Sequence, residues 1–221
     1  MGWVIATSVI ETLAGLFIFV NFPKLVKIFE HNKNVKAYFT NTLQLYFYIL
    51  LPIILCFYYY SGDIVKLILP NEYSGVKIVL PIFVLVIFIH QLVKLINIRY
   101  HLKNKTYIET LCNTSVVALS ILTLFIFRNS YSLETVLFIM LGTEFAFFVT
   151  NMLIRIKDSD YYSYSKLFKT FICLFIICFL TITVLNVLFF EDLFLFILLK
   201  IIMYFIICYS LGYYLRKVIF T

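Results

Sequence analysis

The stretch NFPKLVKIFEHNKNVK, residues 21–36, separates the first apolar run of the chain from the second. Five of its sixteen residues are Lys or His, and Pro23 stands near its start. Short Lys-rich segments between two apolar runs are typical of the cytoplasmic loops of membrane proteins. The stretch therefore predicts a short basic loop between two membrane helices, and it predicts which way the chain faces.

The composition on either side of this stretch supports a membrane protein. Of the 221 residues, 63% are hydrophobic and only 13% are charged, whereas roughly a quarter of the residues of a soluble domain are charged. The mean hydropathy is +1.02, and the apolar runs have the length of about twenty residues that a helix needs to cross the hydrocarbon. We predict an all-α polytopic membrane protein with about seven transmembrane helices.

The apolar runs give the expected positions of these helices. Residues 64–77 are too short and too charged to span, so a re-entrant or interface-lying segment is expected there. Residues 1–155 are predicted to form one unit, and residues 166–221 to add two more helices. The expected helices cover residues 3–22, 43–60, 78–98, 108–127 and 133–154, followed by 167–189 and 193–215.

The distribution of Lys and Arg predicts the orientation. Alternate loops on one side hold thirteen of these residues, and the other side holds Lys66, Lys77 and Arg128. Because cytoplasmic loops carry the excess of Lys and Arg, we expect the N-terminus outside and the C-terminus in the cytoplasm. A polar first helix that starts outside would insert poorly on its own, so Met1 is expected to be an internal residue of a longer protein. The thirteen are Lys24, Lys27, Lys33, Lys36, Arg99, Lys103, Lys105, Arg155, Lys157, Lys166, Lys169, Arg216 and Lys217.

Several classes of function lack support. The formal net charge of +7 lies in short loops rather than on an exposed basic face, so no nucleic-acid partner is expected. No Walker A, GxGxxG, HExxH or GxSxG motif occurs, and we expect no enzyme activity, no cofactor and no metal site. The five cysteines lie inside apolar runs without a CxxC spacing, which favours small buried side chains over disulfides.

Ionisable residues at membrane depth are the candidate functional residues, because their burial in hydrocarbon is costly. Glu11 shares one face of the first helix with Thr7 and Ser8 at helical spacing. Glu144 and His90 are further candidates for a substrate cavity. The alternatives are a structural pairing of each acid with a neighbouring helix, and, for His90, a side chain that reaches towards the cytoplasmic loop.

Two other helices carry polar stripes at spacings of three and four residues. These stripes predict faces that contact protein rather than lipid. Lys94 and Lys200 are expected to extend their amino groups towards the membrane surfaces. The third helix carries His90, Gln91, Lys94 and Asn97, and the fourth carries Thr110, Asn113, Val117 and Ser120.

The order of motifs over about residues 10–110 resembles the C-terminal half of Wzx-type polysaccharide flippases. These proteins belong to the multidrug, oligosaccharidyl-lipid and polysaccharide exporter superfamily. Their pattern there is a basic loop starting at proline, a helix, a Gly- or Pro-containing segment ending in Glu-Tyr, and a helix opening with Leu-Pro. The matching residues are Pro23, Pro70, Glu72, Tyr73, Leu80 and Pro81.

The resemblance implies two lobes of six helices that rock about a central cavity. It implies that this chain holds part of the C-terminal lobe and two extra helices, and that it lacks the N-terminal lobe. Such a protein moves undecaprenyl-diphosphate-linked sugar repeat units across the bacterial cytoplasmic membrane for O-antigen, lipopolysaccharide or capsule assembly. The implied partners are that lipid-linked oligosaccharide, membrane lipids, and a missing N-terminal lobe or a polysaccharide polymerase.

The resemblance also implies that this chain alone is inactive in transport. Three alternatives remain at this stage. The chain could be a fragment of a drug or ion antiporter of the same superfamily, or a non-transport membrane subunit of polysaccharide assembly. A receptor with seven helices and an outside N-terminus is the third, although no buried Lys paired with a carboxylate is evident in the sequence.

Overall fold

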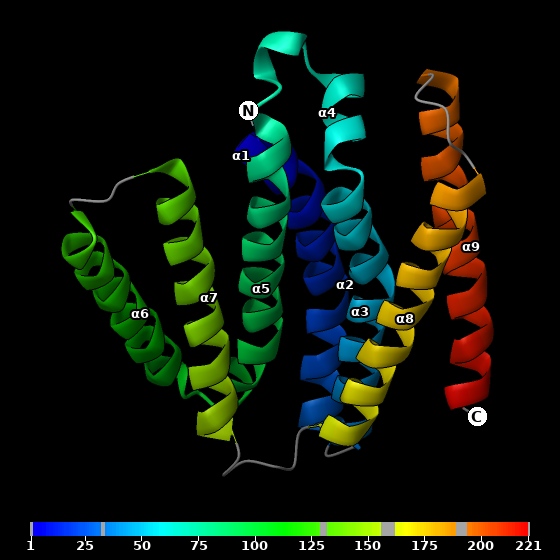
Figure 1. Cartoon of the computed structure of the whole chain (residues 1–221). Coiled ribbons are helices and arrows are strands. Elements are labelled where there is room, and N and C mark those ends of the chain that lie inside the picture. The colour runs from blue at the N-terminus through cyan, green and yellow to red at the C-terminus, as the bar shows by residue number, and fades with distance from the viewer. Residues whose placement is uncertain (1, 32–33, 129–131, 156–161, 189–193, 221) are drawn as a thin grey trace.

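A computed structural model describes residues 2–31, 34–128, 132–155, 162–188 and 194–220, and every regular element within these ranges is helical. The chain forms long, roughly parallel rods joined by short connections (Figure 1). This confirms the predicted all-α class. The elements are α1 (Gly2–Ala6), the π-helical turn η1 (Thr7–Glu11), α2 (Thr12–Glu30), α3 (Val35–Tyr59), α4 (Ser61–Ile68), the 3-10 turn η2 (Asn71–Tyr73), α5 (Val76–Leu102), α6 (Thr106–Ile126), α7 (Leu133–Arg155), α8 (Tyr164–Leu188) and α9 (Phe194–Phe220).

Among the described residues, six helices are long and apolar enough to cross a membrane, which agrees with a multi-pass membrane protein. The predicted helix over residues 133–154 is present as α7, and its apolar stretch Thr135–Asn151 lies within the described residues. Residue 189, the expected end of the helix over 167–189, and residue 193, the expected start of the helix over 193–215, lie outside the described residues. The six spans are Val4–Glu30, Val35–Tyr59, Val76–Leu102, Thr106–Ile126, Tyr164–Val187 and Ile197–Tyr214.

The predicted basic loop over residues 21–36 is wrong over most of its length. Helix α2 continues through Pro23 to Glu30, and α3 begins at Val35 rather than near residue 43. Lys is a good helix former, so a basic stretch need not end a helix. The side-chain oxygen of Asn34 accepts a hydrogen bond from the backbone N–H of Ala37 at 3.2 Å and caps the start of α3. The connection is therefore confined to residues 31–34.

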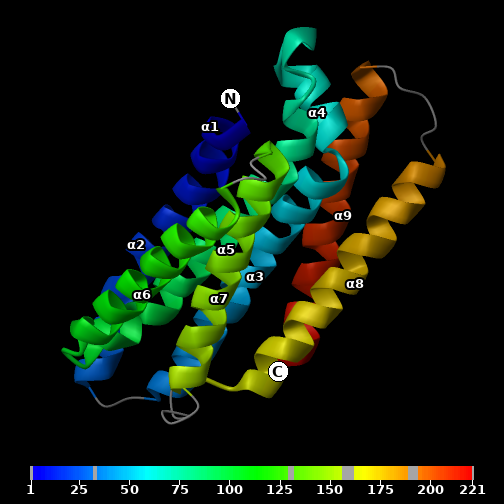
Figure 2. The ribbon, with the colours of Figure 1, turned by 60° about the vertical axis from the view of Figure 1, so that its left-hand side comes forward.

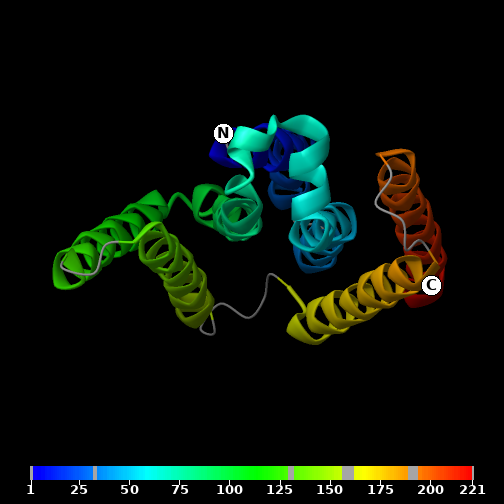
Figure 3. The ribbon, with the colours of Figure 1, turned by 45° about the horizontal axis from the view of Figure 1, so that its top comes forward.

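The central helices are α2, α3 and α5, and two helix pairs flank them (Figures 2 and 3). Helix α5 packs against α3 and α1 on one side and against α7 on another, while α6 packs mainly on α7. Helices α8 and α9 form a pair that contacts α3. Both helices therefore bury one side against the rest of the bundle.

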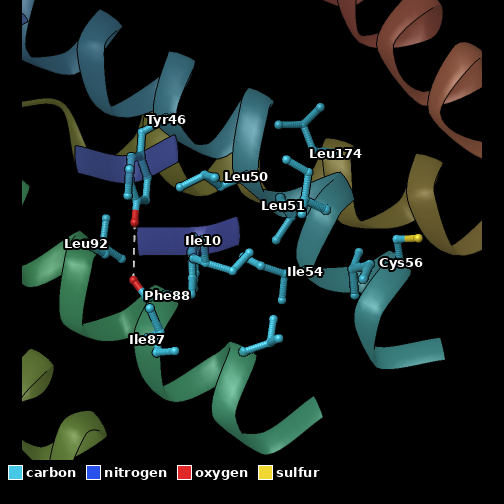
Figure 4. Packing of buried hydrophobic residues seen from close by; sticks show 14 of the residues in the cluster. Ile10, Tyr46, Leu50, Leu51, Ile54, Cys56, Ile87, Phe88, Leu92 and Leu174 are labelled. Atoms are coloured by element: carbon cyan, nitrogen blue, oxygen red, sulfur yellow. Dashed lines mark hydrogen bonds between the residues drawn. The ribbon is translucent and has the colours of Figure 1, made fainter. Parts of the chain in front are cut away.

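A cluster of buried contacts lies where η1, α3 and α5 meet (Figure 4). Tyr46 of α3 is fully buried, and its ring stacks on that of Phe88 in α5 with 5.6 Å between the ring centroids. Its hydroxyl donates to the carbonyl oxygen of Phe88 at 3.3 Å. Ile10 of η1 and Leu50 of α3 are buried in the same cluster. This cluster fixes η1, and with it Glu11, against α5.

The helix ends that carry most of the basic residues gather at one end of the bundle (Figure 1). The ends of α2, α5, α7 and α9 and the starts of α3, α6 and α8 lie there, whereas α4 and η2 lie at the opposite end. Lys33 and Lys157, which contributed to the charge count, lie outside the described residues. The segment expected to be re-entrant or interfacial contains the eight-residue α4 and the turn η2, both too short to span.

Candidate functional site

The predicted polar stripe of the first helix coincides with the π-helical turn η1. Single π-helical turns inside α-helices occur frequently at functional sites, because they change the direction in which side chains point. The hydroxyl groups of Thr7 and Ser8 both donate to the carbonyl oxygen of Val4, at 3.1 and 2.6 Å. Their protons are used within the helix, and their oxygen lone pairs can still accept hydrogen bonds.

Glu11 ends this turn and is held by Gln91 of α5. The amide nitrogen of Gln91 donates to the carboxylate oxygen Oε1 of Glu11 at 3.3 Å. Gln91 is 3% exposed, whereas Glu11 belongs to the exposed residues. The structural pairing considered from the sequence is thus present, but it holds only one side of the carboxylate. The other side of Glu11 remains accessible.

His90 and Glu144 form a second polar contact, between α5 and α7. The ring nitrogen Nδ1 of His90 lies 3.2 Å from Oε1 and 3.3 Å from Oε2 of Glu144. The two side chains are 41% and 21% exposed, so the contact is partly shielded. The His90 imidazole thus lies within hydrogen-bonding distance of both carboxylate oxygens of Glu144 and joins α5 to α7.

The predicted stripe of His90, Gln91, Lys94 and Asn97 does not form one face. Adjacent residues of a helix point about 100° apart, so His90 contacts α7 while Gln91 contacts η1. Lys94 is exposed. The candidates Glu11 and Glu144 therefore lie on different sides of α5, and the structure does not combine Thr7, Ser8, Glu11, His90 and Glu144 into one cavity.

Sequence reasoning missed a third set of polar residues at the basic end of α5. Glu109 of α6 lies 2.8 Å from Nε2 of His101, and its Oε1 accepts a hydrogen bond from Asn97 at 3.4 Å. Arg99, counted as a loop residue from the sequence, lies within α5 and is 1% exposed. Its Nη2 donates to the Tyr100 hydroxyl at 2.9 Å. These contacts fasten the α5–α6 connection.

The polar stripe of α6 does not pack against another helix of the described residues. Thr110, Asn113 and Val117 are exposed and Ser120 is half-buried. The hydroxyls of Thr110 and Ser120 donate to carbonyl oxygens of their own helix at 3.3 and 2.8 Å. The interhelical contact expected from the sequence is therefore not made by this face within the described part of the chain.

Two further sequence expectations concern Lys200 and the cysteines. The amino group of Lys200 lies 5.9 Å from the ring centroid of Tyr60, at the end of α3, so it contacts an aromatic ring of the protein. The cysteines are free thiols, four of them buried and Cys173 half-buried. Within the described ranges, no group of three or more His, Cys, Asp or Glu residues could hold a metal ion.

The contact between His90 and Glu144 predicts a measurable coupling energy. We expect Glu144→Ala and His90→Ala each to destabilise the protein, and the double variant to lose about 1 kcal/mol less than the sum of the two, as hydrogen bonds between membrane helices do. Reversible unfolding in mixed micelles measures this cycle. His90→Ala combined with Glu72→Ala, an exposed acid in η2, should be additive. If the losses of unfolding free energy in Glu144→Ala and His90→Ala simply add in the double variant, the contact between His90 and Glu144 is contradicted.

Comparison of the chain with protein-family models, with curated proteins and with solved structures finds no match.

Proposed function

We propose that this chain is the membrane-embedded C-terminal part of a flippase for undecaprenyl-diphosphate-linked sugar repeat units. Two supports carry the proposal: the motif resemblance over about residues 10–110, and the accessible carboxylate of Glu11 within a helix that is long and apolar enough to span. A carboxylate facing hydrocarbon is costly, so this face is expected to meet water, substrate or a second helical bundle.

The chemistry around Glu11 suits the sugar part of such a substrate. A carboxylate accepts hydrogen bonds from sugar hydroxyl groups, and the oxygens of Thr7 and Ser8 can accept more. Gln91 fixes one carboxylate oxygen at 3.3 Å and so limits the directions that the other can take. The diphosphate is anionic and is repelled by Glu11, so its cationic partners belong to the opposite wall of the cavity. In this proposal a second lobe supplies that wall.

The proposed orientation follows from the basic end of the bundle. The helix ends that carry Lys and Arg lie together, and we assign this end to the cytoplasmic side of the bacterial inner membrane. The N-terminus is then outside and the C-terminus inside. Glu11 stands nearer the outer end of its helix, because it lies nine residues after Gly2 and α2 ends at Glu30 nineteen residues later.

Binding of a lipid-linked oligosaccharide tests the role of Glu11. We expect a photoreactive undecaprenyl-diphosphate oligosaccharide to label η1 in the purified chain. Glu11→Ala should lower this labelling about tenfold, the value of one hydrogen bond to a charged group. Glu11→Gln, which keeps an acceptor, should lower it less. Labelling of wild type and Glu11→Ala is compared by mass spectrometry over a titration of the probe.

Glu72→Gln is the matched control, because Glu72 is an exposed acid outside the long helices. It should leave the labelling unchanged. Equal labelling of wild type and Glu11→Ala would contradict the proposed site. A second test uses a flippase-deficient strain, in which we expect this chain alone not to restore polysaccharide export. Restored export by these residues alone would contradict the need for a second lobe.

A drug or ion antiporter of the same superfamily is the second candidate function, and the accessible carboxylate of Glu11 favours it specifically. An anionic side chain at membrane depth attracts an organic cation. A lipophilic cation that displaces the oligosaccharide probe from wild type, and binds about tenfold more weakly to Glu11→Gln, would favour this antiporter over the flippase.

A further inference from the structure

A groove between α2 and α3 is separate from both polar contacts of α5. Its volume is about 410 Å³. The walls are mostly apolar, and the polar groups among the lining residues belong to Asn21, Lys24 and Tyr46, whose hydroxyl donates to Phe88. Val20 is 53% exposed and Leu16 is 57% exposed, so the groove opens to the surroundings of the bundle. Its principal lining residues are Leu16, Val20, Asn21 and Lys24 from α2 and Leu45 and Ile49 from α3.

The length of the groove matches one leaflet of a bilayer. Leu13 and Lys24, both lining residues, are eleven residues apart in α2, which corresponds to about 16 Å of helix. Half of a hydrocarbon core of roughly 30 Å has nearly the same length. Because Lys24 lies towards the basic end of α2, the apolar part of the groove extends from that surface to the middle of the membrane.

The charged end of the groove distinguishes it from an ordinary lipid-facing surface. Lys24 lines the groove, and Lys27 and Lys36 are also exposed at this end of α2 and α3. Glu30 is the only acid among the described residues between Lys24 and Lys36. Basic pockets between membrane helices on the cytoplasmic side bind anionic lipid headgroups. The amino group of Lys24 thus suits the phosphate of an anionic lipid, and the apolar groove beside it suits an acyl chain of the same lipid.

We propose that this groove binds an anionic phospholipid of the cytoplasmic leaflet, with an acyl chain along Val20 and Ile49 and the phosphate beside Lys24. The length favours a phospholipid over a polyprenyl phosphate, since an acyl chain extends through one leaflet and an undecaprenyl chain is much longer. The bound lipid would stabilise the packing of α2 on α3. This site does not depend on the role proposed for Glu11.

The test measures lipid binding to the purified full chain by native mass spectrometry. Phosphatidylglycerol and phosphatidylcholine with the same acyl chains are titrated separately. We expect wild type to retain phosphatidylglycerol about fivefold more strongly, and Lys24→Gln to remove this preference, because one cation near the surface accounts for about this much. Lys105→Gln removes an exposed charge at the start of α6, at the same end of the bundle, and should keep the preference.

A second pair of variants tests the apolar part. Val20→Trp fills the groove and should lower the retention of both lipids at least fivefold. Val117→Trp adds the same ring on α6, where the residue is 58% exposed, and should leave retention unchanged. Equal losses in Lys24→Gln and Lys105→Gln, or wild-type retention in Val20→Trp, would overturn the proposal. Tighter binding of undecaprenyl phosphate than of phosphatidylglycerol would also overturn it.

Discussion

Replacing Tyr46 by alanine is expected to lower the free energy of unfolding by about 3 kcal/mol, the lower part of the range for removing a large buried ring. Tyr46 is fully buried and connects three helices. Its ring stacks on Phe88 of α5 and meets the edge of Phe17 of α2, with 5.6 and 5.8 Å between ring centroids. Its removal leaves a cavity at the centre of the bundle.

The membrane explains why the lower part of the range applies. Lipid tails are as apolar as the core, so helices in a bilayer gain little from transferring side chains out of their surroundings. The loss for Tyr46→Ala therefore comes mainly from dispersion contacts and from the cavity. The hydrogen bond from the Tyr46 hydroxyl to the Phe88 carbonyl, at 3.3 Å, adds a smaller amount.

Unfolding in mixed micelles with increasing denaturing detergent measures this loss. Tyr46→Phe keeps the ring and removes the hydroxyl, so it should cost no more than about 1 kcal/mol. Phe125→Ala is the control for loss of a ring from the exposed surface, since Phe125 of α6 is 66% exposed, and it should change stability little. A loss for Tyr46→Ala as small as that for Phe125→Ala would contradict the packing in Figure 4.

The class of fold follows from the sequence because membrane helices have a length set by the bilayer. Runs of apolar residues located every long helix that the structure describes, although the bounds were wrong where the residues were polar. Residues 21–36 are the clearest case, since their Lys and His predicted a loop where helix α2 continues to Glu30. Helix α2 extends to Glu30 because its basic end needs no hydrocarbon around it.

The contact between His90 and Glu144 could have been predicted from depth. His90 lies twelve residues before the end of α5 and Glu144 eleven residues before the end of α7. The two helices run in the same direction, because α6 alone separates them in the chain. Nearly equal distances from equivalent helix ends place both side chains at about the same level. The sequence does not give the rotation of each helix, which decides whether side chains at one level meet.

The rotation of α5 about its own axis, which the sequence does not give, also explains why Gln91 was not predicted as the partner of Glu11. Gln91 was assigned to the face of His90, although one residue of displacement turns a helical side chain by about 100°. The burial of Arg99 could not be predicted either, because a count of charges by loop does not distinguish a buried guanidinium from an exposed one. Both errors come from patterns that record position along the chain and not the neighbours of each helix.

Replacing Gly212 by leucine is expected to lower the free energy of unfolding by about 2 kcal/mol, the usual cost of overpacking. Gly212 of α9 is buried, and a Cβ atom there would clash with the ring of Tyr48 in α3. The same seam holds a hydrogen bond from the Tyr48 hydroxyl to the Tyr209 carbonyl at 2.6 Å, which depends on the close approach. Small residues allow such approaches between membrane helices.

Gly142→Leu, at an open position of α7, should cost little in the same unfolding assay. Because Tyr48→Ala removes the obstructing ring, Gly212→Leu should cost less in that background. An unchanged cost there would show that the ring of Tyr48 is not what requires a glycine at this position.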